Sequence, residues 1–185
     1  MTTSVSKLMI EAGQKARAAS RRVAAASTAD KNKALLCLAE LLEAKKEDIF
    51  AANEQDLVRA KKNGLKESFV DRLRVTEKVL RLMAEGARQT AALPDPVGEI
   101  SEMRRRPSGI QVGRMRVPLG VLGIIYESRP NVTVDAACLA VKSGNACILR
   151  GGSEAFETNR ILGELVQQAL TETGLPTEEI GRAHV

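Results

Sequence analysis

Apolar side chains in the first half of the chain recur at three- and four-residue spacing, a pattern typical of helices with one buried face. Leu35, Leu38 and Leu42 form one such stripe, and Leu80, Met83 and Ala87 form another. We expect helices over about 5–26, over a segment that starts near 28, over about 47–62, and from Thr76 to just before Pro94.

Capping residues support these boundaries. Ser27 or Thr28 can accept hydrogen bonds from the first turn of the second helix, and Thr76 precedes the last one. Gly64 follows two lysines and an asparagine, and glycine readily takes the left-handed conformation that ends many helices. Pro94 cannot continue a helix, because it lacks a backbone N–H group.

The pattern changes at about residue 99. Residues 99–106 and 110–117 alternate partly and flank Pro107-Ser108-Gly109, which predicts a hairpin. This segment is rich in arginine and includes the run Arg104-Arg105-Arg106. Charge runs are usually surface features, so we interpret the run as a solvated hairpin or a contact between subunits.

From residue 117 the chain reads as strand, helix, strand, helix. The apolar run 121–126 is typical of a strand covered on both faces, and Ala146–Leu149 is a second short strand. An apolar stripe over 134–141 marks the helix between them, and another over 162–169 marks the helix that follows. A parallel sheet with right-handed crossovers is expected from this order.

Composition narrows the class of protein. Hydrophobic residues make up 44% of the 185 residues and charged residues 28%, as in ordinary globular domains. No apolar run is long enough to span a membrane, and the N-terminus lacks the apolar segment of a secretory signal. The net charge of +5 permits an anionic partner, but the stacking aromatics of nucleic-acid modules are missing. Three cysteines without a CxxC pair favour reduced thiols in the cytoplasm and no metal site.

Two loops follow the predicted strands and should lie at the same edge of the sheet, where open α/β sheets bind ligands. Residues 127–131 place Asn131, an amide donor, directly after a stiffening proline. Residues 150–154 combine Arg150, two glycines and the start of a helix, a set suited to a phosphorylated cofactor. The pattern alone equally allows an ordinary turn with a helix cap. No GxGxxG is present to support a dinucleotide site.

These same loops carry a resemblance to a known family. RVPLGVLGIIYESRPNVTVD (116–135) and KSGNACILRGGSEAFETN (142–159) resemble the signature region of γ-glutamyl phosphate reductases, within the aldehyde dehydrogenase superfamily. Residues 53–73 and 93–100 are similar as well, so the likeness covers about 5–178. It implies an α/β, aldehyde dehydrogenase-like fold. The expected parts are a helical N-terminal region (1–98), an arginine-rich hairpin (99–117) and part of a Rossmann-like NADP-binding domain (118–178).

The resemblance implies reduction of L-glutamate 5-phosphate by NADPH to L-glutamate 5-semialdehyde and phosphate, a step of proline biosynthesis. A cysteine thiolate displaces phosphate in that reaction, and hydride then reduces the thioester. By the resemblance, Asn131 occupies the position of the asparagine that binds the oxyanion in this superfamily. Arg150 occupies the position of a basic residue that lies near the adenosine ribose of the cofactor. Gly151, Gly152, Ser153 and Glu154 complete the implied cofactor loop. In the superfamily, a glutamate that binds the ribose lies three residues after a lysine. Counted from Arg150, the third residue in this chain is Ser153, and Glu154 is the fourth.

The implied nucleophile is absent from this sequence. Cys37 and Cys138 fall on apolar helix faces and Cys147 within a strand, so we expect none of them to be catalytic. The chain is therefore interpreted as an inactive N-terminal fragment of an enzyme that is a homo-oligomer when full length, with glutamate 5-kinase as a candidate partner. Residues 179–185 include EIGRAHV, which resembles a translated sequencing adapter and is expected to be a non-native tail.

Three alternatives remain open from the sequence. The first is another acylating aldehyde dehydrogenase, which uses coenzyme A. The second is a non-catalytic interaction protein built from the same domains, and the third is a basic nucleic-acid binder.

Overall fold

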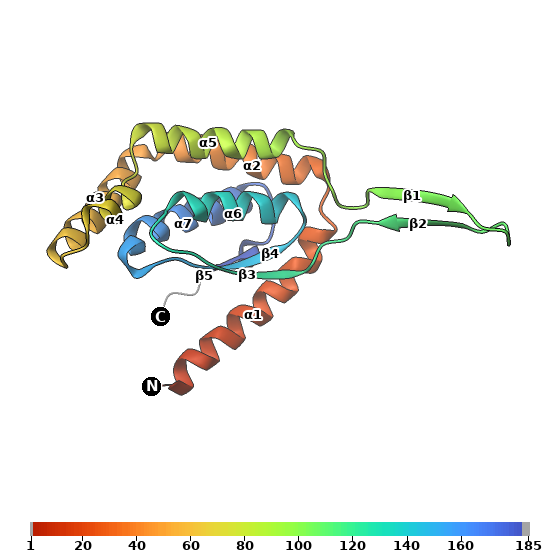
Figure 1. Ribbon diagram of the computed structural model, residues 1–185, viewed down its shortest axis with the longest axis horizontal. Helices are drawn as coiled ribbons and strands as arrows, with labels where there is room; N and C mark the ends of the chain where they lie inside the picture. Colours follow the sequence, from red (N-terminus) through yellow and green to blue (C-terminus); the bar gives the residue numbers. More distant parts are fainter. Residues whose placement is uncertain (1, 183–185) are drawn as a thin grey trace.

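The computed structural model describes residues 2–182, in which helices come first and then alternate with strands (Figure 1). The helical part consists of α1 (Thr2–Ala24), α2 (Thr28–Ala44), α3 (Lys46–Lys62), α4 (Glu67–Leu73) and α5 (Glu77–Ala92). The hairpin consists of β1 (Ile100–Arg105) and β2 (Gln111–Met115). The last part runs through β3 (Val121–Ile125), α6 (Asn131–Lys142), β4 (Ala146–Arg150), a 3₁₀ turn (Ser153–Ala155), α7 (Phe156–Glu172), a second 3₁₀ turn (Thr177–Glu179) and β5 (Ile180–Arg182).

The predicted helix ends are confirmed by their hydrogen bonds. Ser27 Oγ accepts from the Asp30 N–H at 3.1 Å, and Thr76 Oγ1 accepts from the Val79 N–H at 3.3 Å. Gly64 has a φ of +70°, as its place after α3 requires. The short helix α4 was not predicted as a separate element.

The predicted parallel sheet is also confirmed. β3 and β4 pair in parallel from Val121 opposite Ala146 to Ile125 opposite Arg150. The prediction that the first strand is covered on both faces is wrong for this chain. β3 is an edge strand in the order β3-β4-β5, and Ile125 is 80% exposed.

A third parallel strand extends into the segment expected to be a tail. β5 pairs with β4, placing Ile180 opposite Cys147, and the Ile180 side chain is fully buried. Residues 180–182 are therefore part of the sheet and not a tail separate from it. The proposed foreign origin of the segment stays a prediction, and residues 183–185 lie outside the described part of the chain.

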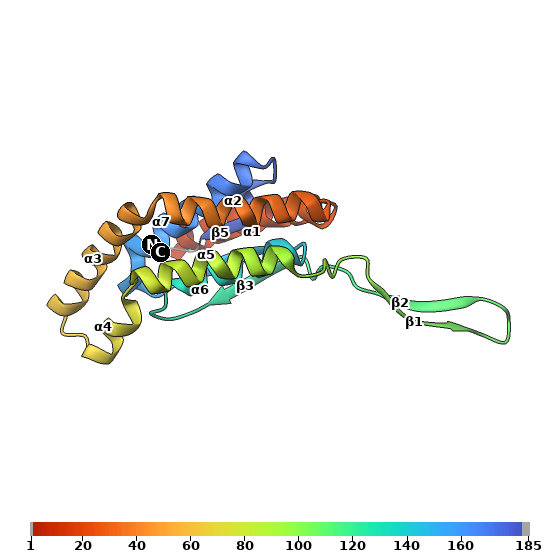
Figure 2. The ribbon, with the colours of Figure 1, turned by 90° about the horizontal axis from the view of Figure 1, so that it is seen from above.

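The elements stack in layers around this sheet. α1 lies against one face of it, and α6 and α7 cover the other (Figure 1). α2 and α5 then pack over α6 and α7 as an outer layer (Figure 2). Alanine is frequent in the core, and small side chains let these helices approach closely.

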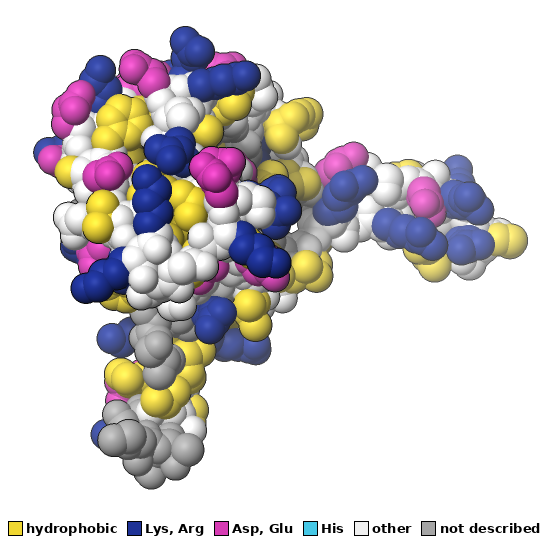
Figure 3. Space-filling model, turned by 60° about the vertical axis from the view of Figure 1, so that its left-hand side comes forward, with side chains coloured by type: hydrophobic (Ala, Val, Ile, Leu, Met, Phe, Trp, Pro, Cys, Tyr) yellow, Lys and Arg dark blue, Asp and Glu magenta, His cyan; other side chains and the backbone are white. Residues whose placement is uncertain are grey.

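The hairpin projects from the body as a two-stranded arm (Figures 1 and 2). Every residue of β1 and β2 is exposed, and basic side chains crowd the arm's surface (Figure 3). Two of its arginines pair with glutamates of the same arm: Arg114 with Glu102 and Arg116 with Glu99. The predicted hairpin is confirmed, and both interpretations of its charge, solvation and subunit contact, remain compatible with this exposure.

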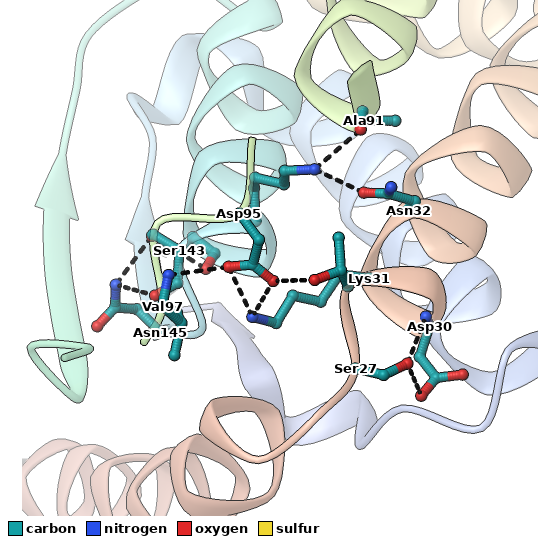
Figure 4. A network of polar contacts seen from close by, with 12 residues as sticks. Ser27, Asp30, Lys31, Asn32, Ala91, Asp95, Val97, Ser143 and Asn145 are labelled. Carbon is teal, nitrogen blue, oxygen red and sulfur yellow. Dashed lines mark hydrogen bonds and ion pairs between the residues drawn. The ribbon is translucent and has the colours of Figure 1, made fainter. Parts of the chain in front are cut away.

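A buried ion pair anchors the base of this arm (Figure 4). The fully buried Lys31 of α2 contacts Asp95 at 2.9 Å, and the same carboxylate accepts from Thr28 Oγ1 at 2.9 Å and from the Val97 N–H at 3.0 Å. Nearby, Lys142 Nζ donates to Asn32 Oδ1 and to the Ala91 carbonyl. These contacts join α2, the end of α5 and the end of α6 where the chain turns out into the hairpin.

Candidate active-site loops at the sheet edge

The two predicted loops leave the sheet side by side. Ile125 lies opposite Arg150 at the end of the paired strands, and the Tyr126 N–H donates to the Arg150 carbonyl at 3.0 Å. The hydrogen bonds between β3 and β4 therefore continue to the residues where the two loops begin. The expectation that both loops line one edge is therefore confirmed.

A hydrogen bond joins the loops directly. Ser128 Oγ, which is buried, donates to Glu154 Oε1 at 2.6 Å, and Ser153 Oγ lies 3.5 Å from the other carboxylate oxygen. Burial opposes ionisation of Glu154. The hydrogen bonds from Ser128, from its own backbone and from Ser153, with the charge of Arg150, nevertheless hold its pKa below the ordinary value. The Glu154 carboxylate is thus ionised and engaged by the protein itself.

The glycine pair at the second loop is required by internal packing. A Cβ at Gly151 would collide with Asn159 Nδ2 and stand 3.1 Å from the Tyr126 ring. A Cβ at Gly152 would lie 2.6 Å from the Glu154 carboxyl carbon. These contacts account for both glycines without a ligand, so close approach of a cofactor to this backbone stays a prediction.

At the start of α7, near which the sequence indicated an anion site, Asp56 of α3 already accepts from two backbone N–H groups, and anion binding elsewhere in the loop stays a prediction. The fully buried Asp56 carboxylate accepts from the Glu157 N–H at 3.2 Å, the Thr158 N–H at 2.8 Å and Thr158 Oγ1 at 2.7 Å, and it also pairs with Arg59. A carboxylate there satisfies the N–H groups and the positive end of the helix. No sequence pattern indicates this contact, since the partners are about a hundred residues apart.

Beneath the loops runs a chain of polar groups. Tyr126 Oη and Thr133 Oγ1 lie 2.6 Å apart, and Thr133 Oγ1 donates to Asn159 Oδ1 at 2.9 Å. The Asn159 Nδ2 group is buried under Gly151 and has no hydrogen-bond partner among the described residues. This chain ties β3, α6 and α7 together below the predicted cofactor loop.

Arg150 remains available to a ligand at this edge. Its side chain is exposed at the end of β4 and forms no salt bridge within 4 Å in the part of the chain that the structure describes. A guanidinium group is well suited to bind phosphate through paired hydrogen bonds. Binding of a cofactor phosphate by Arg150 stays a prediction.

Asn131 begins α6 directly after Pro130, whose φ is −57°. Its Nδ2 group donates to Asp135 Oδ2, one turn along the same helix, at 3.1 Å. The side chain is partly exposed, so its amide can also reach a bound molecule. The oxyanion role stays a prediction.

The cysteines lack the setting of a nucleophile. Burial raises the pKa of Cys138 to about 12, and burial together with the hydrogen bond to Glu172 raises the pKa of Cys37 to about 11. Cys147 is buried within β4. Reactive thiols need exposure and positive surroundings that lower the pKa. Within residues 2–182 no helix could cross a membrane, and no cluster of three or more His, Cys, Asp or Glu could hold a metal ion.

The sequence matches the model of the aldehyde dehydrogenase family over residues 2–180. The chain belongs to this family. A γ-glutamyl phosphate reductase from Thermotoga maritima is 41% identical, with a TM-score of 0.90 over 94% of this chain and 42% of its own. The corresponding reductase from Saccharomyces cerevisiae is 32% identical, with a TM-score of 0.88 over 93% of this chain and 45% of its own.

A probable aldehyde dehydrogenase from Listeria monocytogenes shares the fold at 13% identity, with a TM-score of 0.72 over 98% of this chain and 37% of its own. The chain thus spans less than half the length of these family members. The fold prediction is confirmed by these matches, as is the resemblance on which it was based.

Proposed function

We propose that this chain is the N-terminal part of an NADPH-dependent γ-glutamyl phosphate reductase, which converts L-glutamate 5-phosphate to L-glutamate 5-semialdehyde and phosphate in proline biosynthesis. The observation that carries the proposal is the pair of loops around Asn131 and Arg150, joined by the Ser128–Glu154 hydrogen bond at one sheet edge. The identity of 41% and 32% to two such reductases supports it.

In the proposed reaction the nicotinamide cofactor supplies hydride, and the acyl–phosphate bond breaks with release of phosphate. Asn131 would donate a hydrogen bond to the acyl oxygen, where negative charge develops. Arg150 would bind the phosphate on the adenosine ribose of NADPH. The nucleophile must come from outside this chain, because the pKa values of Cys37 and Cys138 are raised and Cys147 is buried within a strand.

The test is to assay the full-length enzyme in the reverse direction. We expect reduction of NADP⁺ by L-glutamate 5-semialdehyde to require inorganic phosphate and to be slower with NAD⁺. A requirement for coenzyme A in place of phosphate would indicate an acylating dehydrogenase instead. Homo-oligomerisation, association with glutamate 5-kinase and a cytoplasmic location are further parts of the proposal, which size-exclusion chromatography, co-purification and cell fractionation can test.

A further inference from the structure

A cavity of about 330 Å³ lies between α5 and α6, beside Asn131. α5 contributes Gly86, Gln89 and Thr90 to its lining, and α6 contributes Asp135 and Leu139. The two helices approach closely at Gly86, where an added Cβ would stand 3.9 Å from Asp135 Oδ1. Asp135 links this cavity to Asn131, whose amide group the proposed function places at the reacting carbon.

Asp135 supplies the charge of this cavity. One carboxylate oxygen, Oδ2, accepts from Asn131, whereas Oδ1 lies on the side of α5. No lysine or arginine in residues 2–182 forms a salt bridge with Asp135, although its neighbours Gln89 and Thr90 are polar. Loss of hydration raises the pKa of Asp135, and the Asn131 hydrogen bond partly offsets that rise. Asp135 is exposed at the mouth of this open cavity, so its carboxylate is accessible to a ligand that brings a positive charge.

We propose that this cavity binds the amino-acid end of the substrate and that Asp135 forms an ion pair with its ammonium group. This assignment rests on the proposed function, whose substrate carries an ammonium group at one end and the acyl phosphate at the other. Leu139 gives the cavity an apolar wall on which the methylene groups of the substrate can lie. Asp135 would then determine specificity for an α-amino acid over the corresponding acid without nitrogen.

The spacing of the two groups agrees with this substrate. Asn131 Nδ2 and Asp135 Oδ2 lie 3.1 Å apart, and each side chain can hold a further ligand atom about 3 Å away on its free side. In L-glutamate 5-phosphate the acyl carbon and the ammonium nitrogen are joined by four single bonds of about 1.5 Å, which span about 5 Å when extended. One molecule can therefore place its acyl oxygen at Asn131 and its ammonium group at Asp135.

The test compares two substrates in the full-length enzyme. L-Glutamate 5-semialdehyde and 5-oxopentanoate differ only in the amino group, and both would be assayed with NADP⁺ and phosphate. We expect Asp135→Asn to lower kcat/KM for the amino substrate by about 10- to 100-fold, the usual range for a lost hydrogen bond to a charged group. It should change kcat/KM for 5-oxopentanoate by less than about threefold, since Asn keeps the shape of Asp and can still accept from Asn131.

Glu85→Gln is the matched control, because Glu85 is an exposed carboxylate of α5 that Gln89 contacts but that does not line the cavity. It should leave both substrates unchanged. An equal loss for both substrates with Asp135→Asn would overturn the proposal, because Asp135 would then act only through Asn131 or the fold. No loss for the amino substrate would overturn it too. A wild-type enzyme that turns over neither substrate would instead refute the proposed function, and this assignment with it.

Discussion

At the scale of single residues, Arg150 differs from Glu154 and the two glycines of its loop because its side chain is exposed. Glu154 is engaged by Ser128, and Gly151 and Gly152 are closed in by neighbouring side chains. Among the predicted cofactor-binding residues 150–154, Arg150 is therefore the charged side chain that the described residues leave without an ion pair.

Arg150→Ala should raise the KM for NADPH at least several-fold and change the KM for NADH much less, because only NADPH carries the ribose phosphate. Steady-state kinetics of the full-length enzyme with both cofactors measures this. Arg81→Ala, which removes an exposed arginine of α5, serves as the control for net charge. Equal effects of Arg150→Ala on the two cofactors would show that the residue is structural.

Asn131→Ala should lower kcat by about 10²–10³ with a modest change in KM, as found for other donors to a developing oxyanion. The loss appears in kcat because the hydrogen bond strengthens as charge develops on the acyl oxygen. Rapid-quench or steady-state rates in the full-length enzyme give the comparison. A kcat within a factor of two of wild type would remove Asn131 from the mechanism.

At the scale of elements, buried carboxylates hold helices that the chain order keeps apart. Asp56 joins α3 to the start of α7, and Asp95 joins α2 to the base of the hairpin arm. Asp56 is fully buried and Asp95 partly buried, and each is surrounded by donors, so removing the carboxylate leaves those donors unsatisfied. The N-terminal helices thus position the cofactor loop, which follows β4, from outside the sheet.

Asp56→Ala should destabilise the start of α7 by about 3 kcal/mol, because it leaves two N–H groups and a hydroxyl without their acceptor. Hydrogen exchange of the full-length protein should show faster exchange at Glu157 and Thr158. The control is Glu54→Ala, an exposed position on α3, the helix of Asp56, and it should leave the exchange at Glu157 and Thr158 unchanged. Unchanged protection in Asp56→Ala would mean that α7 does not depend on this contact.

The Lys31–Asp95 pair should make stability depend on pH. Burial alone would raise the pKa of Asp95, but the hydrogen bonds from Lys31, Val97 and Thr28 hold it below the ordinary value of about 4. The contribution of this ion pair to the free energy of unfolding is therefore complete above the pKa of Asp95 in the unfolded chain. It is lost as the pH falls through the lower pKa of Asp95 in the folded protein.

Asp95→Asn should lower the free energy of unfolding at neutral pH by about 3 kcal/mol, because Lys31 stays buried without its counter-ion. The difference from wild type should begin to shrink as the pH falls below about 4, where the unfolded chain takes up the proton, and should disappear once the pH is below the lower pKa of folded Asp95. Thermal unfolding between pH 3 and 7 tests this, with the exposed Asp48→Asn as control. A difference in Tm that is constant with pH would contradict the ion-pair account.

At the scale of the whole molecule, the described residues leave apolar surface open. β3 is an unpaired edge with Ile125 80% exposed, and Leu119 just before it is 84% exposed. The arm carries Ile110 at 60% and Met115 at 59% exposure. Open strand edges and apolar patches of this kind promote association.

We predict that residues 1–182 alone have no reductase activity and are poorly stable. Residue 182 is chosen as the end because it retains β5 and the buried Ile180. The measurements are semialdehyde-dependent reduction of NADP⁺ and thermal unfolding. Turnover that is abolished by Cys147→Ser would contradict the predicted lack of activity. A cooperative unfolding transition of the monomer above about 60 °C would contradict the predicted low stability.

The sequence by itself determined the family and most of the elements, although α4 and β5 were not predicted. Helix stripes, the caps at Ser27 and Thr76, the hairpin turn and the two strands depend on local spacing and backbone preference, which adjacent residues specify. The loop motifs around Asn131 and Arg150 likewise lie within short segments, so their place at one sheet edge followed from the order of strands.

Only the tertiary structure decided which polar groups remain for a ligand. Asp56 fills the start of α7, Glu154 turns to Ser128, and Asp135 faces a cavity that Gly86 of another helix completes. Each contact joins segments between about 25 and 100 residues apart in the chain. Spacing within a segment carries no information on such contacts, because the packing of whole helices brings the partners together.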